Sequence, residues 1–175
     1  SVAFEAGIFG VAATLDVQIA AGLLHADAAA ALFHAQRCTE AAGRLRMDQL
    51  QATALFFQAA AYAHDRNPDA MGRCVAEAQR LAPDDPDVNA GIWGAVYAHV
   101  ALLDDDRPQL AACLDRAVDL LRGNPSSAPA PTHGLWALAR TLAGADGATA
   151  RAEASEVARM ALTPSPFASC TMRAV

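Results

Sequence analysis

The amino-acid sequence predicts an all-helical protein that is built from antiparallel helix pairs. Hydrophobic residues make up 54% of the chain but aromatic residues only 6%, so the apolar content comes mainly from Ala, Leu and Val. Ala has the highest helix propensity, whereas sheets favour β-branched and aromatic residues. Residues that start and stop helices also recur at intervals of about one helix, and a short motif recurs at about the length of a helix pair.

Helix-capping residues divide the chain into helices of ordinary length. Asp and Asn side chains accept hydrogen bonds from the free amides at a helix start, and Pro is tolerated at the first helical position. We expect N-caps at Asp27, Asp48, Asn67 and Asp146, with Pro68 opening a helix and Pro83, Gly123 and Pro164 acting as stops. About eight helices result, near residues 3–24, 27–45, 48–65, 68–82, 87–103, 107–122, 133–143 and 147–161.

A repeated motif relates three of these helices. Cys, Ala and Leu occur at positions i, i+4 and i+7 of each helix, which places them on one helical face. Small residues on that face let a neighbouring helix approach closely. The three copies are Cys38-Ala42-Leu45, Cys74-Ala78-Leu81 and Cys113-Ala117-Leu120, and successive copies start 36 and 39 residues apart.

This period is close to the roughly 34 residues of a tetratricopeptide repeat. The middle unit resembles that repeat most closely, although Leu55 and Gln58 depart from the Trp and Leu expected at their positions. The resemblance implies a right-handed stack in which each helix pair covers the apolar face of the next. The matching positions are Ala59, Tyr62, Val75, Ala78 and Pro83.

The predicted helices near 48–65 and 87–103 are apolar almost all round, which is typical of buried helices at the centre of a stack. Residues 123–131 are rich in Pro, Gly and Ser and cannot continue a helix. We therefore expect one domain over residues 1–161, with a long loop before its last helix pair, and an irregular tail over 162–175.

Charge and composition exclude several functions. The net charge is -6, and a field of that sign repels phosphate backbones, so we expect no direct nucleic-acid binding by this segment. All 13 basic residues are Arg, which excludes a Schiff-base lysine and a complete P-loop. Glu5 and Asp16 interrupt the apolar N-terminal stretch, so we expect neither a secretory signal nor a membrane span, and a cytoplasmic location.

The sequence contains several potentially reactive residues, but we recognise no combination of them that would form an active site. His34 and Cys38 could offer two ligands to a metal, but packing of the thiol in the core with a surface His is the simpler interpretation. His64-Asp65 has no nucleophile beside it and is interpreted as a solvated helix end. The acidic runs 84–87 and 104–106 lack calcium-loop spacing and are interpreted as helix starts. We expect no enzyme activity, no cofactor and no metal. The widely spaced Cys38, Cys74, Cys113 and Cys170 are expected to be free thiols, buried in the core.

Large aromatic residues are the candidates for lining a groove or ligand site. Trp93 and Tyr97 lie one helical turn apart, where burial in the core is the simpler alternative. Arg107, Arg116 and Arg122 could bind a carboxylate of another protein, although surface ion pairs with the nearby Asp115 and Asp119 are the simpler interpretation. The candidate lining residues are Tyr62, Trp93, Tyr97 and Trp136.

Several segments resemble the helical-repeat region of large actinobacterial LuxR-family, MalT-like transcriptional regulators. These segments are Ile92-Trp93-Gly94, residues 102–108, residues 114–123 and residues 134–138. The resemblance implies a sensor region between an N-terminal nucleoside-triphosphatase domain and a C-terminal helix-turn-helix, neither of which this chain carries as a motif. We therefore expect a non-catalytic module that binds a protein, neighbouring domains of a longer regulator or a small inducer. A free-standing tetratricopeptide adaptor is the main alternative, and an enzyme with an unrecognised site is a third.

Overall fold

The computed structural model describes residues 2–122, 144, 146, 148–149 and 152, and every regular element in that part of the chain is a helix. The all-helical prediction is therefore confirmed for these residues. The chain divides into two compact units, residues 1–88 and 89–175. The helix predicted at 133–143 and the tail at 162–175 lie outside the described residues, as does most of the helix predicted at 147–161.

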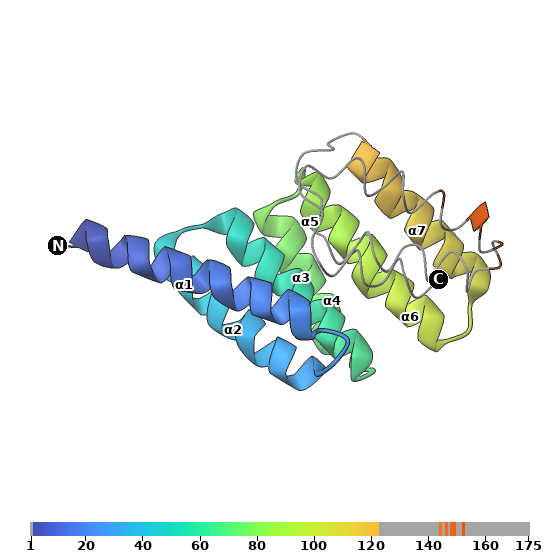
Figure 1. The fold of residues 1–175 in the computed structure, drawn as a ribbon, viewed down its shortest axis with the longest axis horizontal. Helices are drawn as coiled ribbons and strands as arrows, with labels where there is room; N and C mark the ends of the chain where they lie inside the picture. Colours follow the sequence, from blue (N-terminus) through green and yellow to red (C-terminus); the bar gives the residue numbers. More distant parts are fainter. Residues whose placement is uncertain (1, 123–143, 145, 147, 150–151, 153–175) are drawn as a thin grey trace. The chain divides into compact units, whose positions relative to one another are not determined.

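Four helices form the first unit, and each packs against the next in chain order (Figure 1). Their connections have only two to four residues, which forces consecutive helices to run antiparallel. Every predicted boundary in this unit agrees with the structure to within one residue. The helices are α1 (Val2–Leu23), α2 (Ala28–Leu45), α3 (Asp48–His64) and α4 (Pro68–Leu81).

Most of the predicted helix starts are confirmed. The Asp27 carboxylate accepts a hydrogen bond from the Ala30 amide at 2.9 Å, and Asn67 accepts one from the Ala70 amide at 3.1 Å. The prediction for Asp48 is wrong by one position, because Met47 precedes α3 and Asp48 is its first helical residue. A carboxylate there still interacts favourably with the positive end of the helix dipole.

Three helices end in the same left-handed turn, although none of the three turns uses glycine. A residue with a positive φ follows each helix, directly after Leu45 and as the second residue after His64 and Leu103. The next amide donates to a carbonyl five residues earlier, which satisfies a helix-end acceptor. The left-handed residues are Arg46 (φ 54), Arg66 (φ 51) and Asp105 (φ 53). The closing bonds are 2.9 Å each and run from Met47 to Ala42, Asn67 to Tyr62 and Asp106 to Ala101.

Helix α3 forms the centre of the first unit, as its apolar sequence predicts. Phe56 is 1% exposed, and the only buried polar side chain of the helix is Gln58. The Gln58 side-chain amide donates to Thr39 Oγ1 of α2 at 2.7 Å, and the Cys74 thiol of α4 lies 3.9 Å from its carbonyl oxygen. Gln58 thus connects α3 to both neighbouring helices, which explains a polar residue where the repeat pattern has Leu.

The Cys-Ala-Leu motif faces the interior on all three helices. The central Ala42, Ala78 and Ala117 are at most 1% exposed. Cys38 and Cys113 are fully buried and Cys74 is half-buried. Each Leu of the motif is also half-buried. The shared inward face predicted from the motif is therefore confirmed.

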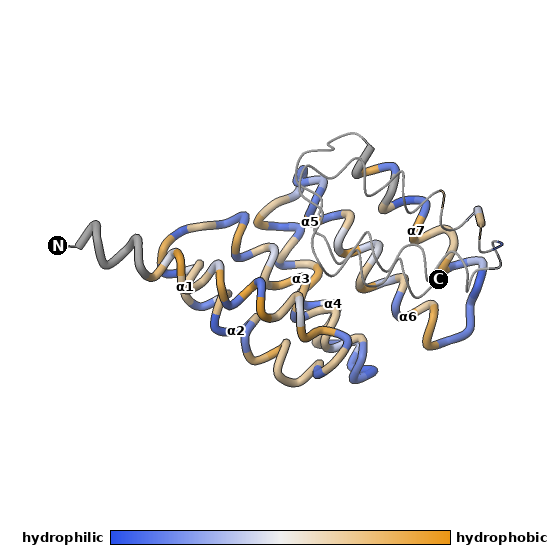
Figure 2. The backbone as a smooth tube through the Cα atoms, viewed as in Figure 1, coloured by the Kyte–Doolittle hydropathy of each residue, from blue (hydrophilic) through white to orange (hydrophobic). Residues whose placement is uncertain are grey.

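The second unit contains most of the helix predicted at 87–103, which starts at the end of the first unit, and the helix predicted at 107–122. The helix predicted at 87–103 is a continuous helical rod made of α5 (Pro86–Gly91), the π-helix η1 (Ile92–Tyr97) and α6 (Ala98–Leu103). Helix α7 (Arg107–Arg122) packs against η1 and α6. Ala90 and Ala117 form a buried contact that Trp93 and Leu120 cover. The turn between α6 and α7 is hydrophilic (Figure 2).

The π-helix accounts for part of the unequal spacing of the repeated motif. The Ala98 amide donates to the Trp93 carbonyl, five residues earlier, so the helix contains one residue more than an α-helix of the same rise. The rod from Pro86 to Leu103 has one residue more than α3, and the connection before it has two more than the connection before α3. These three residues are the difference between the two motif spacings of 39 and 36.

Candidate functional site

A buried carboxylate connects α1 to α2. Asp16 is 8% exposed, and its Oδ1 lies 2.8 Å from Nδ1 of His34. Its Oδ2 lies 3.4 Å from Nε of Arg37, which follows His34 by almost one turn of α2. A buried charge is costly unless it is paired, so these two α2 side chains stabilise Asp16 inside the hairpin. Asp16 was not among the predicted site residues, although it is an isolated acid in an otherwise apolar stretch.

An open groove runs beside this buried carboxylate, between α1 and α2. Its volume is about 270 Å³. Small side chains of both helices and charged side chains of α2 line it. Of the charged side chains, Arg44 and Glu40 are 3.7 Å apart and largely exposed. The residues of this α1–α2 groove are Phe9, Ala12, Ala13, Asp16, Arg37, Glu40, Ala41 and Arg44.

The outer surface of α2 carries an ordered row of side chains along the groove. Phe33, Arg37, Glu40 and Arg44 follow one another at helical spacing and lie on one face of the helix. Phe33 is 54% exposed, and the Arg37 guanidinium carbon lies 5.7 Å from the centre of its ring. The row, here called the α2 row, thus alternates in charge and begins with an exposed aromatic ring.

Helix α1 has a second exposed surface, which is apolar. Val11, Leu15 and Ile19 are spaced four residues apart and are 62%, 58% and 42% exposed. On the other side of the helix, Ala13, Val17 and Ala20 are buried against the rest of the unit. Helix α1 is therefore apolar on two faces, of which only one is covered. An exposed apolar stripe of this kind is typical of a protein-interaction surface.

Two of the four predicted lining residues lie together. The rings of Trp93 and Tyr97 on η1 are 5.0 Å apart between centroids, and both side chains are half-buried. Tyr62 lies in the first unit, where its hydroxyl accepts a hydrogen bond from Gln36 of α2 at 3.5 Å. Trp136 lies outside the described residues. Trp93 packs against the buried pair Ala90 and Ala117.

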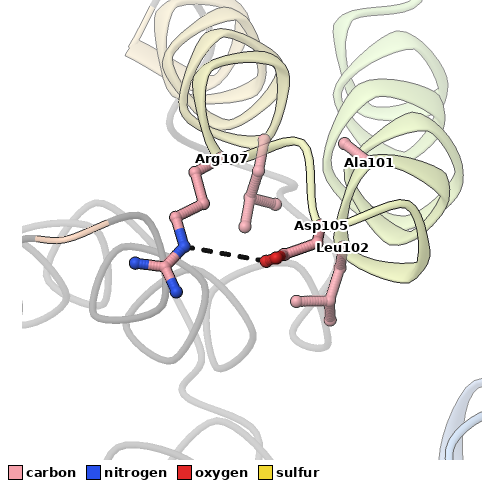
Figure 3. A pocket seen from close by; sticks show the side chains of 5 residues that line it. Ala101, Leu102, Asp105 and Arg107 are labelled. Atoms are coloured by element: carbon pink, nitrogen blue, oxygen red, sulfur yellow. Dashed lines mark ion pairs between the residues drawn. The ribbon is translucent and has the colours of Figure 1, made fainter.

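A small pocket lies at the turn between α6 and α7. Its volume is about 60 Å³, which is enough for water-sized groups only. Arg107 Nε lies 3.7 Å from Asp105 Oδ1 at its mouth, with Leu102 and Ala101 beside them (Figure 3). Arg107 thus pairs with the preceding turn. The side chain of Arg122 lies outside the described residues, and Arg116 is exposed.

The thiols and histidines are placed by packing. Cys38, Cys74 and Cys113 are free, and burial, followed by the nearby Asp16, raises the pKa of the Cys38 thiol to about 11. Such a thiol is a poor nucleophile at neutral pH. His64 is half-buried, unlike the predicted solvated helix end, and its ring lies 5.5 Å from that of His25. Burial lowers the pKa of both imidazoles, and the charge of His64 lowers that of His25 further.

The acidic runs cap helices, as predicted. Asp85 accepts hydrogen bonds from the amides of Asp87 and Val88 at the start of α5, and Asp106 accepts one from Gln109 at the start of α7. Asp146 accepts bonds from Ala148 and Thr149 in the same manner. Among the residues that the structure describes, no three His, Cys, Asp or Glu side chains gather closely enough to hold a metal ion.

Comparison of the chain with protein-family models, with curated proteins and with solved structures gave no match. Within the described part of the chain, no helix combines the length and the apolar character that crossing a bilayer requires. The features that can support a function are therefore those of the chain itself, above all the two exposed surfaces of the α1–α2 hairpin.

Proposed function

We propose that this chain is a non-catalytic interaction module, namely the tetratricopeptide-like helical-repeat region of a LuxR-family transcriptional regulator. The repeated Cys-Ala-Leu motif and the segments that resemble such regulators support the proposal. In this proposal about eight helices form a right-handed stack in the cytoplasm. The module binds a protein, a neighbouring domain of the regulator or a small inducer, and makes no nucleic-acid contact of its own.

The exposed stripe of α1 is the observation that carries the proposal. Three large aliphatic side chains, Val11, Leu15 and Ile19, lie in water along three successive turns of a helix whose other side is buried. Covering such a stripe stabilises a complex by about 25 cal/mol for each Å² of apolar surface that is removed from water. The stripe lies on a hairpin that Asp16 and the α2 side chains hold together, so it is presented by a fixed element.

The proposal has a direct genetic test. A regulator of this class encodes a nucleotide-binding domain before the repeat region and a helix-turn-helix after it. We expect the reading frame that contains residues 1–175 to encode both. A reading frame with neither domain would contradict the regulator assignment.

A functional test follows in the full regulator. Replacing Leu15 by Gln removes apolar surface at an exposed position, so the melting temperature of the protein should stay unchanged while the transcriptional response to inducer or partner changes. Thr14→Gln, at the exposed neighbouring position, is the matched control. An unchanged response of the Leu15→Gln regulator would show that the stripe has no part in its function.

A free-standing adaptor is the alternative, because the same stripe could be covered by a separate protein. In that case residues 1–175 alone should form a stoichiometric complex with one partner, and Leu15→Gln should weaken it. The flanking reading frame separates the two proposals, since an adaptor needs neither a nucleotide-binding domain nor a helix-turn-helix.

A further inference from the structure

The side chains of the α2 row are complementary to an antiparallel copy of the same row. Its members Phe33, Arg37, Glu40 and Arg44 are largely exposed; the side chains of Arg37, Glu40 and Arg44 are 56%, 74% and 81% exposed. When a second α2 is laid antiparallel along the row, with the two-fold axis between Arg37 and Glu40, each Arg37 faces a Glu40 of the other copy. The same operation places each Phe33 opposite an Arg44.

We propose that the α2 row is an interface through which two copies of this chain pair around a two-fold axis. Symmetric dimers use the same patch twice, so the patch must be complementary to itself. The α2 row meets this condition four times, with two Arg37–Glu40 ion pairs at the centre and two Arg44–Phe33 cation–π contacts at the ends. The proposal goes beyond the module's proposed function and does not depend on it.

Charge favours a second copy over other occupants. A uniformly acidic surface would be repelled by Glu40, and a uniformly basic one by Arg37 and Arg44. An apolar surface would remove water from these charges without offering them a partner of opposite charge. The occupant must carry opposite charges in the reverse order and a ring at one end, which the same chain supplies.

The contacts within one chain leave these charges available. Arg44 and Glu40 are 3.7 Å apart and both largely exposed, so their pairing within one chain is weak. Arg37 approaches Asp16 through Nε at 3.4 Å, which leaves the far end of its guanidinium for a carboxylate from outside. All three side chains can therefore engage a second copy without disrupting the core.

The surface beside the row allows a close approach. Ala12 and Ala13 of α1 and Ala41 of α2 line the α1–α2 groove, and their small side chains leave space beside the row. Phe9, at the rim of the groove, is 60% exposed and would lose contact with water in the pair. The dimer thus covers apolar surface as well as charges.

A charge-exchange experiment with the full chain tests the proposal. The mass of the wild-type protein in solution, measured by sedimentation velocity and light scattering, should be that of a dimer. Glu40→Arg places Arg opposite Arg, and Arg37→Glu places Glu opposite Glu, so each variant alone should be monomeric. In an equimolar mixture both central contacts again join opposite charges, and a heterodimer should form.

Controls make each outcome decisive. Glu77→Arg makes the same change of charge on the exposed side of α4 and should leave the dimer intact. Arg37→Glu brings a second carboxylate near Asp16, so a variant that melts early is replaced by one that also carries Asp16→Asn. A monomeric wild-type protein, a dimeric Glu40→Arg variant, or a mixture that stays monomeric would overturn the proposal. A dimer that weakens as salt is raised would support it.

Discussion

The Nδ1 atom of His34 on α2 lies 2.8 Å from Oδ1 of Asp16, in the C-terminal half of α1. Arg37 approaches the other oxygen of the same carboxylate. The only buried acid of the described residues is thus held by two side chains of the neighbouring helix. This arrangement fixes the hairpin that carries both exposed surfaces.

Removing the buried carboxylate should destabilise the first unit. Asp16→Ala leaves the His34 ring without its acceptor and deletes the pairing with Arg37, so the free energy of unfolding should fall by about 1–3 kcal/mol. Urea denaturation followed by circular dichroism measures the change. Glu77→Gln, which breaks an exposed ion pair with Arg80 on α4, is the control and should change stability little. Equal stability of Asp16→Ala and wild type would show that the network adds nothing.

The His25–His64 pair should make the protein less stable in mild acid. Both imidazoles have a pKa below the ordinary value of 6.5, although the nearby Asp65 partly opposes the shift at His64. The unfolded chain therefore binds more protons than the folded one once the pH falls below about 6.5, and stability is lost from there down to the folded-state pKa. Melting temperatures measured between neutral pH and pH 5 should decline in the wild-type protein.

The double variant His25→Gln/His64→Gln isolates this effect. Its melting temperature should decline less over the same pH range, because the two groups that take up protons on unfolding are absent. Parallel pH profiles for the two proteins would mean that the pair does not contribute.

The π-helix should tolerate the loss of one residue. Because η1 holds one residue more than an α-helix of equal rise, deleting Gly94 should convert the rod to a continuous α-helix with both ends in register. The same deletion in α3, at Ala60, should rotate half of a largely buried helix away from its contacts. We expect the Ala60 deletion to lower the melting temperature far more than the Gly94 deletion. The reverse order would contradict this account of the motif spacing.

The positions of the helices were predictable because local signals set them. Asp27, Asn67 and Pro68 act through side chains and backbone next to themselves in sequence, and the buried character of α3 follows from an apolar sequence on all its sides. The inward face of Cys38, Ala42 and their equivalents was predictable because a spacing that repeats three times is hard to produce without a common contact.

Other features left no local signal. The left-handed turns at Arg46, Arg66 and Asp105 occupy positions where glycine is usual, so the sequence does not mark them. The extra residue of the π-helix at 92–97 becomes apparent only when the length of the rod from Pro86 to Leu103 is compared with that of α3. The partners of Asp16 lie 18 and 21 residues further along the chain, so their contacts depend on how the hairpin packs.

In the candidate site, too, some features follow from local sequence and others depend on how the helices pack. The pairing of Trp93 with Tyr97 follows from their spacing within one helix. The α1–α2 groove was missed, because its small and charged residues are ordinary ones that become a surface only when two helices meet. The significance of the α2 row likewise depends on knowing which face of α2 is exposed.

The central claim is that the repeated Cys-Ala-Leu face packs each motif helix against its neighbours. Ala78 on α4 and Ala117 on α7 lie on this face and are 0% and 1% exposed. Ala76 and Ala112 lie on the exposed sides of the same two helices and serve as matched controls.

The most direct test is the free energy of unfolding, from urea denaturation, of four single Ala→Arg variants. Ala78→Arg and Ala117→Arg force a charge into the interior and should each lose several kcal/mol, on the order of 3 or more. Ala76→Arg and Ala112→Arg should remain close to wild type. Equal stability of buried-face and exposed-face variants would contradict the shared inward face.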